Sequence, residues 1–128
     1  MLRRTVGVAV LIAFVIFPST AGLADDRDEP VDILIALDKS LSMEQEIGAV
    51  KDYVDRHIVD EILQPGDEFV VIAFYGQNEI PVALTISDES QKASIKQAIN
   101  GLSADGAFTD IGFALDRLRD EVRQHTDK

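Results

Sequence analysis

The sequence contains no cysteine and no tryptophan, and it has only two histidines among its 128 residues. Without cysteine the chain cannot form disulfides or thiolate metal sites. Basic residues are scarce as well, because 12 lysines and arginines face 23 aspartates and glutamates, for a net charge of −11. This charge disfavours nucleic acid and anionic membranes as partners and favours cations or basic protein surfaces. Glycine-rich nucleotide-binding motifs are absent too.

The first 24 residues have the pattern of a secretory signal peptide. Arg3 and Arg4 give a positive start, residues 6–17 are apolar, and residues 18–24 are mostly small. The apolar stretch is shorter than the ~20 residues that a membrane-spanning helix needs, so we expect cleavage and no membrane insertion afterwards. Loss of both arginines would take the net charge from −11 to −13. The protein is therefore expected to be exported, to the periplasm, the cell surface or the medium.

Residues 25–30 (DDRDEP) are predicted to be a short, solvated acidic leader, and residues 31–128 to be one domain. Apolar runs at 31–37 and 69–75 predict strands buried on both faces, as in a parallel sheet. A third strand is expected at 80–86, joined to the second as a hairpin. Pro81 has no backbone N–H for a ladder hydrogen bond, so this strand should lie at an edge.

Helical spacing of apolar residues predicts a helix over 44–63, a second over about 87–101, and a third from about 111 onward. The third helix is expected to pack one apolar face on the sheet, made of Ile111, Ala114, Leu115, Leu118 and Val122. The order of elements predicts an α/β class, doubly wound, with a mostly parallel sheet and one antiparallel edge strand. A central strand at 31–37 needs two neighbours and these elements supply one, so we expect a fragment truncated before a fourth strand.

Asp38, Ser40 and Ser42 stand at every second position after the first strand. In an extended segment such side chains point to one side, so a carboxylate and two hydroxyls can converge beyond the carboxyl end of the strand. Ligands of open α/β sheets bind at that edge. Hard oxygen ligands suit Mg²⁺, with Mn²⁺ or Ca²⁺ as alternatives. A single carboxylate leaves such an ion under-neutralised, which favours an acidic group from outside.

The run DILIALDKSLSM resembles the opening of a von Willebrand factor type A (vWA) domain, whose metal-ion-dependent adhesion site begins with Asp-x-Ser-x-Ser. The stretch GAFTDIGFAL, residues 106–115, resembles the family's second metal loop, in which a threonine precedes a helix. The resemblance runs from about Val31 to the carboxyl end and implies a Rossmann-like fold. It implies further that Asp38, Ser40, Ser42 and Thr109 hold Mg²⁺ and that a Glu or Asp of a partner protein completes the shell. The function implied is non-enzymatic adhesion or assembly, although the family's third loop, with an aspartate after a fourth strand, is missing.

Two other hypotheses remain open for the same residues. Haloacid-dehalogenase-like phosphotransferases also carry an aspartate after the first strand and use Mg²⁺, but their second acid, the proton donor, is replaced here by Ser40. A metal-free structural domain is the other hypothesis. In it, Ser42 and Gln45 form a helix capping box, and Thr109 or Asp110 caps the third helix.

Overall fold

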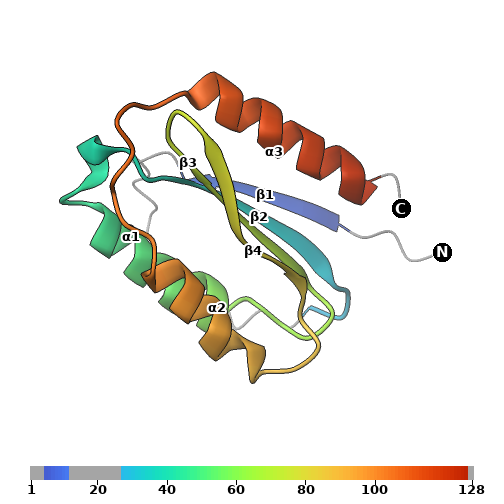
Figure 1. Ribbon diagram of the computed structural model, residues 1–128. Coiled ribbons are helices and arrows are strands. Elements are labelled where there is room, and N and C mark those ends of the chain that lie inside the picture. Colours follow the sequence, from blue (N-terminus) through green and yellow to red (C-terminus); the bar gives the residue numbers. More distant parts are fainter. Residues whose placement is uncertain (1–4, 12–26, 127–128) are drawn as a thin grey trace, which may run out of the picture.

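The computed structural model describes residues 5–11 and 27–126, which form one mixed sheet with helices on both faces (Figure 1). The strands lie in the order β1-β2-β3-β4. Their bounds are β1 Thr5–Leu11, β2 Val31–Asp38, β3 Glu68–Phe74 and β4 Asn78–Thr85. The first three strands run parallel and β4 pairs antiparallel with β3. The predicted class, a mostly parallel α/β sheet with one antiparallel edge strand, is confirmed.

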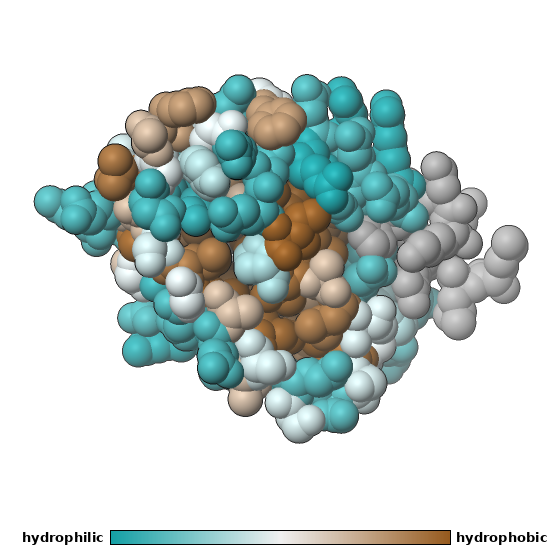
Figure 2. Space-filling view, viewed as in Figure 1, coloured by the Kyte–Doolittle hydropathy of each residue, from teal (hydrophilic) through white to brown (hydrophobic). Residues whose placement is uncertain are grey.

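Strand β4 occupies the edge that Pro81 predicted. Val71 pairs with Val82 and Ala73 with Glu79, so β4 has one residue more than β3 between these pairs. Pro81 lies in this bulge, where a missing N–H costs no ladder hydrogen bond. Figure 2 shows the molecule from the side of β4, with apolar side chains gathered between α3 above and α2 below.

The helices form one layer on each face of the sheet (Figure 1). Their bounds are η1 Leu41–Met43, α1 Ile47–Tyr53, η2 Val54–Asp60, α2 Gln91–Asn100 and α3 Ile111–Thr126. Side chains of β2 alternate between the layers. Ile33, Ile35 and Leu37 pack with residues of α1, η2 and α2, whereas Leu34 packs with Leu118 of α3. This confirms that β2 is buried on both faces.

Three helix predictions need correction. The helix expected from about residue 87 begins at Gln91. The helix expected over 44–63 begins only at Ile47, after the short 3₁₀ turn η1, and widens into the π-helix η2. The wider turn allows the adjacent Ile58 and Val59 both to be buried. On α3, Ala114 and Leu118 pack on the sheet as expected, but Ile111 and Leu115 are exposed. Because α3 alone among the described helices covers its face of the sheet, it contacts the strands along a stripe that is narrower than the apolar face of the helix.

Part of the predicted signal peptide lies in the sheet. β1 pairs with β2 in parallel from Thr5 opposite Val31 to Leu11 opposite Leu37. It therefore supplies the second neighbour that the predicted elements left missing beside β2. The rest of residues 1–24 lies outside the described residues, and cleavage remains a prediction. No helix within 5–11 and 27–126 is both long and apolar enough to cross a membrane.

Removal of residues 1–24 is expected to lower the melting temperature and to promote self-association. The truncation takes away β1 and turns the apolar β2 into an open edge strand, which is a template for pairing with other chains. Light scattering and thermal unfolding of residues 25–128, compared with the full chain, measure both effects. A monomeric truncated chain with an unchanged melting temperature would contradict the role of β1 in the sheet.

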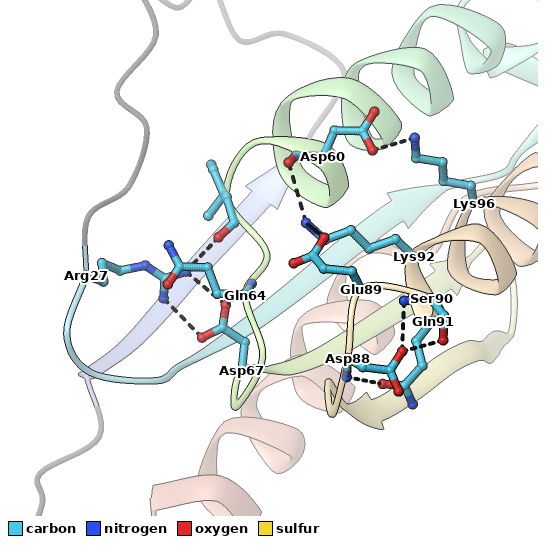
Figure 3. Close-up of polar contacts among 11 residues, drawn as sticks. Arg27, Asp60, Gln64, Asp67, Asp88, Glu89, Ser90, Gln91, Lys92 and Lys96 are labelled. Carbon is cyan, nitrogen blue, oxygen red and sulfur yellow. Dashed lines mark hydrogen bonds and ion pairs between the residues drawn. The ribbon is translucent and has the colours of Figure 1, made fainter.

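Contacts between Arg27 and Asp67 hold the start of the domain (Figure 3). They lie at the end of the sheet opposite Asp38. Asp67, immediately before β3, is 1% exposed. Its carboxylate accepts two hydrogen bonds from the Arg27 guanidinium, at 3.2 and 2.9 Å. It also accepts the backbone N–H groups of Val31 and Gln64, at 2.9 and 2.8 Å. Arg27 is thus bound to the domain, which corrects the prediction of a solvated leader at this residue.

Candidate metal site

Three of the four predicted site residues meet where β2 ends. Asp38 is the last residue of β2, and the chain leaves it in an extended conformation, with Ser40 at φ −65° and ψ 158°. Asp38 Oδ1 accepts the Ser40 N–H at 2.8 Å, and the hydroxyl oxygens of Ser40 and Ser42 are 2.9 Å apart. The three residues thus lie together, but the extended segment predicted through Ser42 ends at Ser40, because Ser42 lies in the 3₁₀ turn η1.

The spacing of the two hydroxyls fits a magnesium shell. Mg²⁺ binds oxygen at about 2.0–2.1 Å in an octahedron, which places neighbouring ligands about 3 Å apart. Ser40 Oγ and Ser42 Oγ are 2.9 Å apart, as two adjacent ligands of one ion would be. Among the described residues, no group of three or more His, Asp or Glu gathers to hold a metal. Any ion here would therefore depend on hydroxyl ligands beside Asp38.

The helix-capping explanation of Ser42 is wrong. Helix α1 begins at Ile47 with Glu46 at its N-cap, and no side chain makes a cap hydrogen bond there. The Ser42 hydroxyl instead pairs with that of Ser40. For α3 the cap is Asp110, whose Oδ1 accepts the N–H of Phe113 at 2.9 Å. Thr109 is thus not needed as the cap.

The loop that carries Thr109 is joined to the first loop through Gly106. Leu41 N–H donates to Gly106 O at 2.8 Å, and Gly106 N–H donates to Lys39 O at 3.1 Å. Ser40 and Gly106 form an isolated parallel bridge. Thr109 itself is exposed, between this bridge and the α3 cap. Its loop therefore lies next to the loop of Asp38, Ser40 and Ser42.

Two glycines permit close packing behind these loops. A Cβ atom added at Gly106 would overlap the Cβ atom of Tyr75 and lie 2.6 Å from its Cγ. One added at Gly76 would overlap the far edge of the Phe108 ring. The backbone N–H of Asp110 also donates to Tyr75 O at 3.0 Å. The residues that follow β3 thus fix the position of the second loop.

Lys39 is the residue that sequence reasoning missed at this site. Only 6% of it is exposed. Its Nζ lies 2.9 Å from Asp105 Oδ1 and 3.3 Å from Glu79 Oε2, and 5.1 Å from the centre of the Tyr75 ring. Burial acts to lower the pKa of Lys39, but hydrogen bonds and charge from Asp105 and Glu79 outweigh it and leave the pKa raised. The position of Lys39 between Asp38 and Ser40 was the feature of the sequence that could have indicated its place at the site.

The sequence model of the von Willebrand factor type A domain matches residues 33–128. The chain belongs to the vWA domain family. An uncharacterized protein of Treponema pallidum (strain Nichols) is 33% identical over 97 residues, which are 74% of this chain. The vWA chain spans 44% of that relative's length.

Solved structures with this fold include two vWA-like proteins. The vWA protein from Catenulispora acidiphila matches with a TM-score of 0.57 and 26% identity, over 70% of this chain and 22% of its own. Proximal thread matrix protein 1 of the mussel byssus matches with a TM-score of 0.57 and 25% identity, over 70% and 24%. Another structure of the mussel protein, 23% identical and with the same TM-score, has zinc in its metal-ion-dependent adhesion site. This vWA chain thus spans about a quarter of those proteins.

Proposed function

We propose that this chain is an exported, metal-dependent protein-binding module. Mg²⁺ would be held by the Asp38 carboxylate and the hydroxyls of Ser40, Ser42 and Thr109, with Mn²⁺ or Ca²⁺ as substitutes. The observation that carries the proposal is the meeting of Asp38, Ser40 and Ser42 at the carboxyl end of β2. Zinc in the metal-ion-dependent adhesion site of the mussel matrix protein supports a divalent cation as the ligand proposed here.

The charge around the site favours an acidic partner. Asp38 is the sole carboxylate of the proposed ligand set, and the nearby Asp105 and Glu79 are engaged by Lys39. An ion with one negative ligand keeps net positive charge and attracts a further carboxylate. A Glu or Asp side chain of a partner protein would supply it, with no bond made or broken.

The surface beside the loops suits a protein partner. Leu41 lies between the two serines and is 55% exposed, and Phe108, next to Thr109, is 65% exposed. Ile111 in the first turn of α3 is exposed as well. Exposed apolar residues around a polar centre are typical of protein interfaces. We infer adhesion or assembly as the role, in the periplasm, on the cell surface or outside the cell.

Asp38→Ala is expected to weaken metal binding by more than about 100-fold, because it removes the only charged ligand and loss of an outer-shell partner alone costs about 10- to 100-fold. Calorimetric titration with Mg²⁺ and Mn²⁺ measures the affinity. Asp52→Ala is the matched control, since Asp52 is exposed on α1 and its loss changes the net charge equally. The proposal fails if the intact chain takes up neither ion, or if Asp38→Ala binds as well as the control.

Binding of a partner needs a second readout. When exported proteins are passed over the immobilised domain in the presence of Mg²⁺, we expect a partner protein to be retained and then released by EDTA. The same partner should not bind the Asp38→Ala variant. Retention that is indifferent to both EDTA and Asp38→Ala would rule out metal-dependent binding.

A further inference from the structure

Lys39 is an unusual residue to find buried at the end of a strand. A lysine with 6% exposure is costly unless its charge is paired. Here Nζ contacts Asp105 at 2.9 Å and Glu79 at 3.3 Å, and the Tyr75 ring lies beside it at 5.1 Å. Both acids are largely exposed, at 63% and 47%. The lysine therefore holds two otherwise solvated side chains close to the site.

These contacts join three separate segments. Lys39 itself follows β2, Glu79 belongs to β4, and Asp105 lies in the loop between α2 and α3 that also carries Thr109. The backbone pair between Lys39 and Gly106 runs beside the ion pair with Asp105. The second loop is thus fixed to the first by a side chain and by the main chain at adjacent positions.

We propose that Lys39 is a positioning residue of the metal site. It holds the Thr109 loop against Asp38, Ser40 and Ser42, and it keeps the carboxylates of Asp105 and Glu79 directed at its own ammonium group. The inference rests on the proposed function. It assigns the residue between Asp38 and Ser40 to the geometry of the site, although Lys39 carries the wrong charge to bind a cation.

The test compares two variants that break the same ion pair with opposite changes of charge. Lys39→Met removes a positive charge near the site, and Asp105→Asn removes a negative one. If Lys39 acted only through its electric field, Mn²⁺ would bind more tightly to Lys39→Met and more weakly to Asp105→Asn. Positioning predicts that both variants bind Mn²⁺ more weakly, each by about 10- to 100-fold.

Further variants sharpen the result. The double variant Lys39→Met with Asp105→Asn is expected to bind Mn²⁺ about as weakly as whichever single variant has the lower affinity. Each substitution breaks the same Lys39–Asp105 ion pair, so their effects should not add. Lys39→Arg keeps the charge but changes the shape of the cation, so its affinity should lie between those of wild type and Lys39→Met. If Lys39→Met does not fold, Lys39→Arg still decides, because a field effect predicts no change.

The matched control is an ion pair between two helices, outside the two site loops. Lys96 of α2 pairs with Asp60 of η2 at 2.5 Å, and the pair is drawn in Figure 3. Lys96→Met and Asp60→Asn should leave Mn²⁺ affinity unchanged. Opposite shifts in Lys39→Met and Asp105→Asn, or wild-type affinity in Lys39→Met, would overturn the positioning role alone. Absence of Mn²⁺ uptake by the wild-type chain would instead overturn the proposed function, and this inference with it.

Discussion

Asp67→Ala is expected to lower the free energy of unfolding by about 3–5 kcal/mol, the range for removal of one partner from a buried ion pair. The Asp67 carboxylate is 1% exposed and accepts hydrogen bonds from Arg27, Val31 and Gln64. Its loss leaves a guanidinium and two backbone N–H groups without this acceptor. Urea unfolding followed by circular dichroism gives the change.

Two comparisons separate this effect from a general loss of charge. Asp67→Asn keeps one acceptor oxygen, so we expect a smaller loss. Asp116→Ala removes an exposed acid that pairs with Arg119 at 3.1 Å, and such surface pairs are worth about 0–1 kcal/mol. A loss below about 1 kcal/mol for Asp67→Ala would show that the domain start is not held through this carboxylate.

Metal affinity of the folded Asp67 variants should match that of wild type. Asp67 precedes β3, whereas Asp38 lies at the other end of β2, and an eight-residue strand is about 26 Å long. As long as the variant remains folded, loss of the Asp67 carboxylate at one end of the sheet should not move the proposed ligands at the other end. The stabilising contacts of Asp67 are therefore at one end of the sheet, and the proposed metal site is at the other.

Local patterns in the sequence were sufficient for strands β2, β3 and β4 and for the residues of the first site loop. The nearly continuous apolar run along residues 31–37 specifies two buried faces, and Ile35 and Leu34 indeed face opposite layers. Pro81 has no backbone N–H to donate, so its strand was expected at an edge of the sheet. Asp38 and Ser40 follow the two-residue period of an extended segment, whereas the 3₁₀ turn η1, which that period does not predict, brings Ser42 to Ser40.

Other features depend on contacts between distant residues, which spacing alone does not encode. Lys39 is buried because Glu79 and Asp105 meet it, and they lie 40 and 66 positions further along the chain. The exposure of Ile111 depends on how much of α3 the sheet can cover. A strand at β1 was not predicted because the apolar composition of that segment equally fits a signal peptide.

Gly106→Ala is expected to cost about 3 kcal/mol of stability and to weaken metal binding more than tenfold. The new methyl group would overlap Tyr75 Cβ, which the main chain of Tyr75 fixes in place. Since Gly106 also bonds to Lys39 and Leu41, relief of the overlap must pull the two site loops apart. Urea unfolding and Mn²⁺ titration measure the two effects.

Two other glycines of the chain serve as controls for Gly106→Ala. Gly48 is within α1 and an added Cβ has nothing within 4 Å, so Gly48→Ala should stabilise the domain by about 0.5–1 kcal/mol. Gly76→Ala meets only the outer ring atoms of the exposed Phe108, which can turn away into solvent. If Gly106→Ala resembled either control in stability and in Mn²⁺ affinity, the close approach to Tyr75 would not set the distance between the loops. A loss confined to Gly106→Ala would mean that the site depends on backbone contact between its loops, beyond the ligands themselves.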